Sequence, residues 1–333
     1  MRLAIDAMGG DHAPGEIVRG VLGARQALPD DSFVLVGEAD AIEAELAAAG
    51  ADAERLDLLH AGQRVAMAES PVEAVRRKPD SSLRRAVELV ADGRADAVVS
   101  AGNTGAFVAA AHMIAKRLPG VRRPGISVVF PTVHGPVVVI DVGANVDSRP
   151  VHLLQYGLMA GVYAREVFGV GDPRVGILSI GEESQKGNEL AREARDLMQK
   201  SALNFQGNAE GRDIFNGRFD VVVCDGFVGN IVLKSVEALA DSVFQTVVAK
   251  VREMPGDARD ALMPVMCDLQ RRHDAEEYGG APLLGVNGVA IICHGNARAR
   301  AVTNALRVAA TYARQEVNRT IVQEIAQAEG ARA

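Results

Sequence analysis

The segment Val221-Val222-Val223-Cys224-Asp225-Gly226-Phe227-Val228-Gly229-Asn230 contains the pattern that decides the fold. A short β-branched run is followed by a turn of Asp, Gly and Asn, and a helical pattern continues from there to about Val251. A buried strand that ends in a glycine turn and enters a helix is the building unit of a parallel α/β sheet. The segment therefore predicts one such strand–turn–helix unit.

The same unit recurs along the whole chain. Other apolar runs that end in a polar, glycine-bearing turn are Leu3–Ile5, Phe33–Val36, Ala97–Val99, Val175–Ile180 and Val289–Cys293. Ile126–Phe130 and Val137–Ile140 predict an antiparallel hairpin, because only a few residues join them. We therefore predict an α/β fold, with a mostly parallel sheet flanked by helices in three layers. Residues 1–333 form one catalytic unit, with two lobes around a cleft.

Residues 252–278 interrupt this alternation and predict a helical tip. Between Asp257 and Arg272 the apolar residues recur at helical spacing and lie beside several arginines. One interpretation is a helix that contacts a partner subunit or caps the fold. The other is an amphipathic element that lies on anionic lipid or receives an acidic carrier protein.

Composition excludes several classes of protein. Hydrophobic residues make up 48% and charged residues 24%, which is typical of an ordinary globular protein. The net charge of −7 disfavours a nucleic-acid partner. The three cysteines are widely spaced and suggest neither a disulfide framework nor a zinc site. The chain enters an apolar strand within two residues of Met1, so we expect a cytoplasmic protein.

Glycine beside Asn, Asp or Glu follows at least five of the strands, and such loops point to an anionic ligand. Glycine lets the backbone approach a ligand, and the N-terminus of the next helix offers free N–H groups. Each loop alone is equally well explained as a turn or a helix cap. Motifs for a dinucleotide, a P-loop nucleotide, an acyl-serine hydrolase or paired metal-ligand histidines are absent from the sequence, so we expect no metal and no cofactor.

Taken together, the loops resemble those of the PlsX family of phosphate acyltransferases. The matching motifs are Asp6–Asp11, Ser100–Gly105, Asp141–Asn145, Gly181–Glu183 with Lys186–Glu189, Asn208–Gly211, Cys224–Asn230 and Gly279–Gly285. They span nearly the whole chain in order, and as a set they are highly specific. Asn296-Ala297-Arg298 departs from the pattern, because Ala stands where we expect a small polar residue.

The resemblance implies an activity, partners and a fold. The family transfers an acyl group from acyl carrier protein to inorganic phosphate, giving the acyl-phosphate that feeds phospholipid synthesis. Its fold is similar to the phosphotransacetylase and isopropylmalate dehydrogenase group. Its members are homodimers that visit the membrane surface, so this chain is expected to be cytoplasmic and peripheral on the inner face of the membrane.

Three residues are the predicted catalytic groups. We assign Lys186, in the glycine-bearing loop after the Val175 strand, to the phosphate, although such a lysine also suits a solvated helix start. Asp225 would accept a proton or orient Lys186, or would cap the following helix. Asn230 would donate its amide to phosphate or to the thioester oxyanion, or would act as a simple cap.

Further residues are predicted to bind substrate or support the site. Asn188, like Asn230, is either an amide donor or a helix cap. Asn103 and Thr104 are candidates to line the same cleft, with capping as the alternative. Glu182 would position Lys186 or be structural. The remaining predicted site residues are Gly226 and Gly229, which would let the backbone approach the ligand, and Asp141 and Asn145, which would support the site from behind.

An acidic carrier protein also needs a basic landing area. The candidate clusters are Arg76-Arg77-Lys78, Arg84-Arg85, Lys116-Arg117 and Arg122-Arg123. Two other functions stay open at this point. Four strand-end aspartates, Asp6, Asp11, Asp141 and Asp225, would suit a metal- and NAD-dependent decarboxylating dehydrogenase on a related fold. The same glycine loops would suit a non-catalytic protein that binds anions or lipid.

Overall fold

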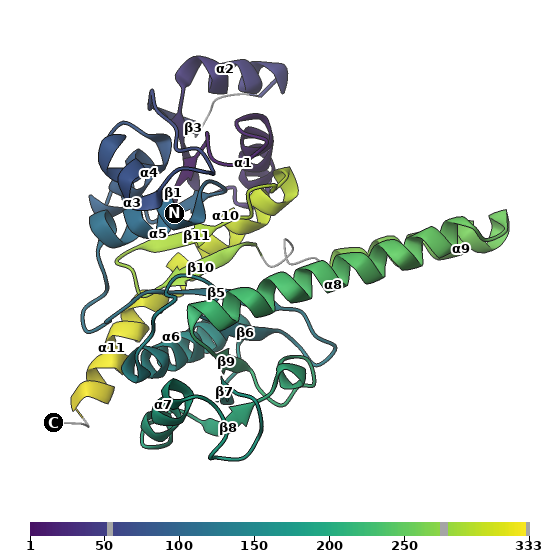
Figure 1. The fold of residues 1–333 in the computed structure, drawn as a ribbon. Helices are drawn as coiled ribbons and strands as arrows, with labels where there is room; N and C mark the ends of the chain where they lie inside the picture. Colours follow the sequence, from purple (N-terminus) through teal and green to yellow (C-terminus); the bar gives the residue numbers. More distant parts are fainter. Residues whose placement is uncertain (52–55, 274–278, 331–333) are drawn as a thin grey trace.

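A computed structural model describes residues 1–51, 56–273 and 279–330 of the protein. A single mixed β-sheet runs through it (Figure 1). The described residues form 11 strands in the order β3-β2-β1-β4-β11-β10-β5-β6-β9-β7-β8. Their bounds are β1 (Arg2–Asp6), β2 (Ser32–Gly37), β3 (Leu56–His60), β4 (Ala97–Ser100), β5 (Gly125–Phe130), β6 (Val137–Ile140), β7 (Val175–Leu178), β8 (Phe205–Ala209), β9 (Val221–Val223), β10 (Ala281–Leu284) and β11 (Val289–Ile292).

The sheet consists of two parallel groups joined by antiparallel strands. In the first group, β3, β2, β1, β4 and β11 are parallel to one another. In the second, β6, β9, β7 and β8 are parallel. β10 and β5 lie between the groups and pair antiparallel with their neighbours. The predicted hairpin of β5 and β6 is confirmed, with Ser127 opposite Ile140.

Helices connect the strands. Their bounds are α1 (Gly15–Ala27), α2 (Ala39–Ala48), α3 (Pro71–Arg77), α4 (Ser82–Ala91), α5 (Thr104–Ala110), the π-helix η1 (Ala111–Ala115), α6 (Pro150–Phe168), α7 (Glu189–Gln199), the 3₁₀ helix η2 (Gly211–Ile214), α8 (Gly226–Arg252), α9 (Gly256–His273), α10 (Ala299–Arg314) and α11 (Val317–Gly330). The final helical stretch of the chain consists of α10 and α11. It is divided at Glu316, whose φ of 50° lies in the left-handed region and ends the first segment.

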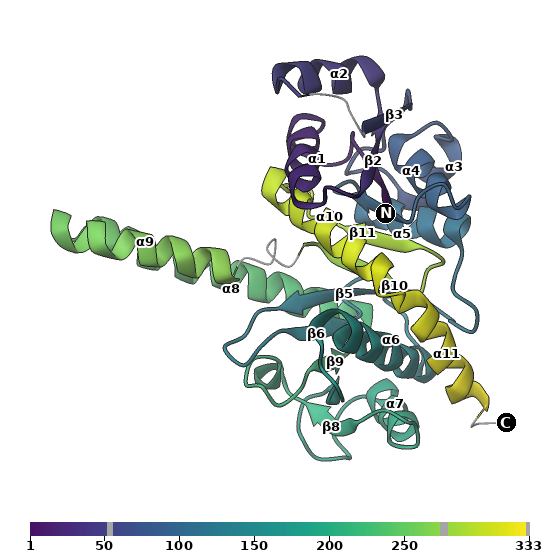
Figure 2. The ribbon, with the colours of Figure 1, turned by 180° about the vertical axis from the view of Figure 1, so that it is seen from behind.

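The strands send alternate side chains to two cores, one on each face of the sheet. Leu3 and Ile5 pack into one core and Ala4 into the other, as the two-residue period of a strand requires. Buried residues of α1, α6, α7, α10 and α11 complete the first core (Figure 2). Residues of α3, α4, α5 and η1 complete the second. The predicted three-layer architecture is therefore confirmed.

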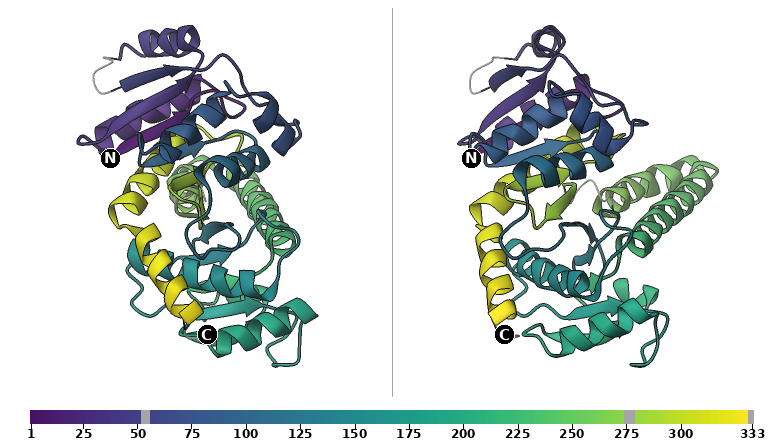
Figure 3. Two further views of the ribbon diagram at one scale, coloured as in Figure 1. Left: turned by 90° about the vertical axis from the view of Figure 1, so that its left-hand side faces the viewer. Right: turned by 60° about the vertical axis from the view of Figure 1, so that its left-hand side comes forward.

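The helical tip is the far part of a two-helix arm. α8 leaves the body and α9 folds back beside it, so the pair projects away from the sheet (Figure 3). The predicted helix at 257–272 is confirmed as α9, and the helix predicted to about Val251 is confirmed as α8, whose projection from the body was not predicted. Part of the predicted tip, residues 274–278, lies outside the described residues. Large apolar side chains on the arm face outward, and Leu239 is 66% exposed.

Candidate functional site

Three loops that carry predicted site residues lie at one edge of the sheet. β6, β9 and β7 are adjacent and parallel, so the loops that follow them emerge on the same side. These loops contain Asp141, Asp225 and Lys186. The topology thus brings the three loops to neighbouring positions, as expected for a ligand site in an α/β sheet.

Asp141 is the most enclosed of the predicted residues. Its side chain is fully buried, and its carboxylate accepts hydrogen bonds from the backbone N–H groups of Ile126, Gly143, Ala144 and Asn145 at 2.8–3.1 Å. Burial raises the pKa of this carboxyl, while the hydrogen bonds from Ala144 and its neighbours lower it again. Asp141 therefore fixes the 141–145 loop, as its predicted supporting role requires.

Asn145 ties this loop to two other elements. Its amide nitrogen donates to the Pro124 carbonyl at 2.6 Å, to the Tyr156 hydroxyl at 2.9 Å and to the Asp141 carboxylate at 3.0 Å. The backbone carbonyl oxygen of Asn145 accepts the N–H of Gly226, the first residue of α8, at 2.9 Å. Asn145 thus joins the loop after β6 to the start of α8.

The two glycines at the start of α8 allow this loop to approach. A Cβ on Gly226 would lie 2.6 Å from the Asn145 carbonyl oxygen, and one on Gly229 would lie 1.9 Å from that of Asp141. We predicted that these glycines would let a ligand approach the backbone. The described contacts instead show the backbone of 141–145 in that space.

Asp225 caps α8, which confirms the structural alternative for this residue. Its carboxylate accepts the N–H groups of Phe227 and Val228, each at 3.0 Å. The Gly229 N–H bonds to the Asp225 carbonyl oxygen, so the N–H groups of the first turn are all engaged. The expectation of free N–H groups for an anion is therefore wrong at α8. These N–H groups are therefore not free to hold an anion.

Asn230 lies inside α8, so the alternative that it caps the helix is wrong. Its side chain faces the loop after β6, where a Cβ on Gly143 would lie 3.6 Å from the Asn230 amide oxygen. Asn230 is exposed. Its amide remains available to a ligand at the junction of the two loops.

Lys186 lies in the loop that joins β7 to α7. Its side chain is exposed, and it packs near Gly181, since a Cβ there would lie 3.1 Å from the Lys186 Cγ. The buried amide of Asn208 holds this loop by donating to the carbonyls of Gly181 and Glu183 at 3.0 and 2.9 Å. Asn188 caps α7 by accepting the Ala191 N–H at 2.8 Å, which confirms its structural alternative.

Glu182 forms ion pairs with two arginines. Its carboxylate lies 3.2 Å from the guanidinium groups of Arg212 and Arg218. Within residues 1–51, 56–273 and 279–330, Lys186 has no carboxylate within 4.0 Å. The contacts of Glu182 thus favour the structural alternative and do not place it on Lys186.

Asn103 and Thr104 follow β4, in the other parallel group of strands. The Asn103 amide donates to the carbonyls of Ala66, Met67 and Glu69, and its oxygen caps α5 through the Ala106 N–H at 2.9 Å. Thr104 is exposed at the first position of α5. The described contacts do not join either residue to the cluster around Asp141. Their place in the same cleft stays a prediction.

Asp6 braces the first loop. Its buried carboxylate accepts the Ser100 hydroxyl at 2.7 Å and the Met8 N–H at 3.3 Å, and burial raises its pKa. Among the described residues, no group of three or more His, Cys, Asp or Glu side chains is arranged to hold a metal ion. The carboxylates of Asp6 and Asp141 accept backbone N–H groups, and that of Asp225 caps α8.

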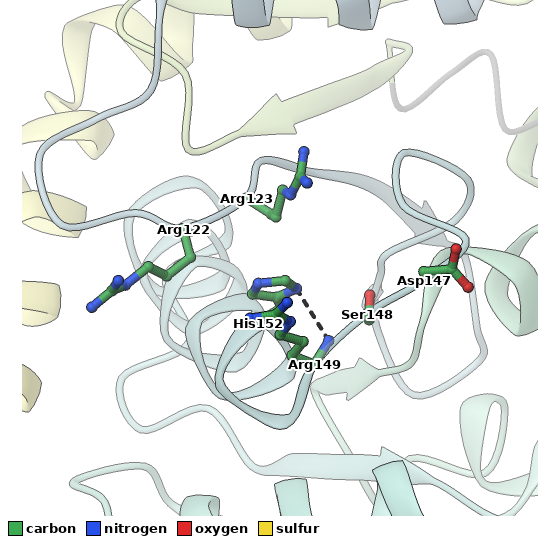
Figure 4. A pocket seen from close by; sticks show the side chains of 6 residues that line it. All are labelled: Arg122, Arg123, Asp147, Ser148, Arg149 and His152. Atoms are coloured by element: carbon green, nitrogen blue, oxygen red, sulfur yellow. Dashed lines mark hydrogen bonds between the residues drawn. The ribbon is translucent and has the colours of Figure 1, made fainter.

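A basic pocket beside this edge was not predicted. It has a volume of about 490 Å³ and is lined by Arg122, Arg123, Asp147, Ser148, Arg149 and His152 (Figure 4). The residues come from two segments, the one before β5 and the one that leads from the Asp141–Asn145 loop into α6. Arg122-Arg123 was predicted only as a landing area for a carrier protein. Arg149 and His152 were missed because nothing in the sequence links them to that pair.

Comparison with known proteins gives consistent matches. The family described as "Fatty acid synthesis protein" matches residues 1–320. A "Phosphate acyltransferase" of Desulforamulus reducens is 50% identical over 313 residues, which cover 93% of this chain and 92% of the relative. One of Pelotomaculum thermopropionicum is 48% identical over 327 residues, which cover 98% and 94%.

The solved structures confirm the predicted similarity of fold. A phosphotransacetylase from Streptococcus pyogenes superimposes with a TM-score of 0.65 and 17% identity, covering 95% of this chain and 94% of that protein. EutD phosphotransacetylase from Staphylococcus aureus gives a TM-score of 0.60 at 17% identity, covering 94% of each chain. In the part of the chain that the structure describes, no helix is long and apolar enough to cross a bilayer.

Proposed function

The chain belongs to the fatty acid synthesis protein family, and from this premise we propose that it transfers a fatty acyl group from acyl carrier protein to inorganic phosphate, giving an acyl-phosphate for phospholipid synthesis. The observation that supports this most strongly is the nearly full-length relationship to proteins named phosphate acyltransferase. We place the reaction at the sheet edge where three adjacent loops emerge.

The proposed reaction is a direct transfer. A phosphate oxygen attacks the thioester carbonyl carbon, the C–S bond breaks with its electron pair on sulfur, and the proton of hydrogen phosphate moves to the thiolate. Phosphate is already an anionic nucleophile at neutral pH, and a thiol of pKa about 8.5 is a competent leaving group. Positioning and charge neutralisation then supply most of the rate enhancement.

Side chains at the edge have the chemistry that this transfer needs. We assign the exposed ammonium of Lys186 to the phosphate and the exposed amide of Asn230 to the phosphate or the thioester oxyanion. Asp225 supports Asn230 indirectly by capping the helix that presents it. Asp141 and Asn145 hold the loop that faces Asn230.

The α8–α9 arm is the proposed contact with a second subunit or with the membrane. Apolar side chains are exposed along both helices, and the most exposed are Leu239, Phe227, Val243 and Val265, at 66%, 56%, 54% and 52%. Burying such a surface is favourable. We propose that the protein is a cytoplasmic homodimer that associates peripherally with the inner face of the membrane.

Product identification tests the proposed function. Purified protein is mixed with a fatty acyl thioester of carrier protein and inorganic phosphate, without added metal, and the products are identified by mass spectrometry. We expect acyl-phosphate and free carrier protein in equal amounts, and no turnover when phosphate is omitted. Carrier release that does not depend on phosphate, or an inactive protein with the genuine substrate, would contradict the proposal.

A further inference from the structure

The basic pocket of Arg123, Arg149 and His152 has features of an anion site, and its lining includes none of the proposed catalytic groups. Its volume of about 490 Å³ exceeds what one small anion needs, so part of a larger ligand can enter with it. Asp147 is its single lining carboxylate, against three lining arginines. The lining therefore has a positive balance of charge.

Two of these arginines have no ionic partner. Throughout residues 1–51, 56–273 and 279–330, neither Arg123 nor Arg149 lies within 4.0 Å of a carboxylate, and both are exposed. Arg122 differs, because its guanidinium pairs with Glu329 at 3.6 Å and its side chain is turned away from His152 (Figure 4). Two guanidinium groups are thus free to form bidentate hydrogen bonds with a phosphate.

His152 is set up to donate a hydrogen bond. Its Nδ1 accepts the Arg149 N–H at 3.1 Å, so a neutral ring has its proton on Nε2. Burial lowers the pKa of the His152 imidazole, and the charges of Arg123, Arg149 and Arg122 lower it further. The ring is therefore neutral at physiological pH and offers Nε2–H as a donor.

The start of α6 adds to the positive potential. Arg149 is the N-cap and His152 the third residue of this 19-residue helix, so the pocket lies at its N-terminus. The helix dipole places a partial positive charge there. The same loop contains Asn145, which bonds to the first residue of α8, so the pocket is mechanically joined to the proposed catalytic edge.

We infer that this pocket binds a phosphate group of a substrate, held by Arg123, Arg149 and the Nε2–H of His152. The inference rests on the proposed function, which provides two sources of that chemistry. One is the inorganic phosphate that attacks the thioester. The other is a phosphate ester within the prosthetic arm of the acyl donor. In both cases the arginines neutralise phosphate oxygens that form no bond to the thioester carbonyl carbon.

Direct binding of inorganic phosphate tests the pocket without relying on turnover. Phosphate is titrated into the full-length protein by isothermal titration calorimetry, with Arg123→Gln, Arg149→Gln and the matched control Arg94→Gln, which removes an exposed arginine outside the pocket. We expect the affinity to fall at least about tenfold in the two pocket variants, as for a lost charge-assisted contact, and to stay unchanged in the control. Thermal unfolding verifies that each variant is folded.

Steady-state kinetics then identify the source of the phosphate group. A rise of at least about tenfold in the KM for inorganic phosphate assigns the pocket to the nucleophile. An equal rise in the KM for the acyl thioester, with weaker binding of that substrate, assigns it to the phosphate ester of the donor. Pocket variants that match the wild type in phosphate affinity and in both KM values overturn the inference. A wild-type protein that binds phosphate here without acyl transfer overturns the proposed function alone.

Discussion

Gly229, in the first turn of α8, lies so close to Asp141 that a Cβ on this glycine would stand 1.9 Å from the Asp141 carbonyl oxygen. This oxygen belongs to the backbone of the 141–145 loop. The Asp141 side-chain carboxylate holds that loop by accepting hydrogen bonds from four backbone N–H groups. The loop therefore cannot yield without losing those bonds. The contact fixes how α8 meets the sheet.

Gly229→Ala should consequently be strongly destabilising. We expect a loss of about 3 kcal/mol or more in the free energy of unfolding, because overpacking against fixed backbone forces the helix and loop apart. Chemical denaturation measures the change. Gly171→Ala is the matched control, since a Cβ at Gly171 meets no atom within 4 Å. Equal stability of the two variants would show that the loop moves freely.

Lys186→Ala tests the proposed catalytic edge. Removal of an ammonium that holds phosphate should raise the KM for phosphate or abolish turnover, with little effect on stability because the side chain is exposed. Initial rates at varied phosphate concentration measure it. Lys200→Ala removes an exposed lysine at the far end of α7 and should behave as the wild type. An unchanged KM and kcat in Lys186→Ala would remove this residue from the mechanism.

The strand–turn–helix unit at Val221–Asn230 was predictable from the sequence, whereas the basic pocket was not. The Val221–Val223 strand, its Asp-Gly turn and the helix after it were predictable, because strand period, turn chemistry and helix capping all act within ten residues. Their position beside the Asp141 loop followed from the rule that parallel strands share one loop edge. By contrast, Arg123 and His152 line the same pocket only because α6 packs against β6 and β9 and accepts the Arg122 N–H through Gln155, which no local pattern encodes.

The roles of individual polar residues were also less predictable than their positions. Asp225 and Asn188 suited either a ligand or a helix cap, and both are caps. Asn230 was open to the same two interpretations but lies within the helix, facing Gly143. Asp225 and Asn230 belong to the same short sequence motif, but one lies at the cap and the other inside the helix. Only the tertiary structure shows which groups each side chain faces.

Residue Asn208 should control the loop that presents Lys186. Its buried amide donates to two carbonyls of that loop, so Asn208→Ala leaves both acceptors without their partner. We expect a cost of about 1–3 kcal/mol in unfolding free energy, together with a higher KM for phosphate. Urea denaturation and initial rates measure the two effects. Asn287→Ala, which removes an exposed amide outside this loop, is the control. A large loss of stability with an unchanged KM would separate the loop from phosphate binding.

Stability should depend on His152 in mildly acidic solution. The folded protein holds the pKa of this imidazole below the value of about 6.5 that it has when unfolded, through burial and the charges of Arg123, Arg149 and Arg122. The unfolded state therefore binds a proton more readily, and stability falls as the pH drops below about 6.5. The loss is complete below the folded pKa.

Melting temperatures between pH 5 and 8 measure this dependence. In His152→Gln the part of the decline that comes from this group should disappear, so the difference from the wild type should change with pH in that window. His134→Gln, at an exposed histidine, is the control. Saturating phosphate should weaken the decline in the wild type, because a phosphate anion beside the ring raises the pKa of the imidazole. If the melting temperatures of the wild type and His152→Gln change with pH by the same amount, the electrostatic account is contradicted.

The exposed face of the α8–α9 arm should mediate association. Leu239→Glu places a charge on the most exposed apolar position of α8, and we expect it to shift the protein from dimer to monomer in sedimentation velocity experiments. Gln245→Glu adds the same charge at an exposed polar position and should leave the dimer intact. Leu262→Glu, on α9, tests the membrane contact by co-sedimentation with anionic vesicles. Loss of vesicle binding in a variant that remains dimeric assigns α9 to the lipid surface, whereas unchanged binding removes α9 from that role and leaves the arm with subunit contact alone.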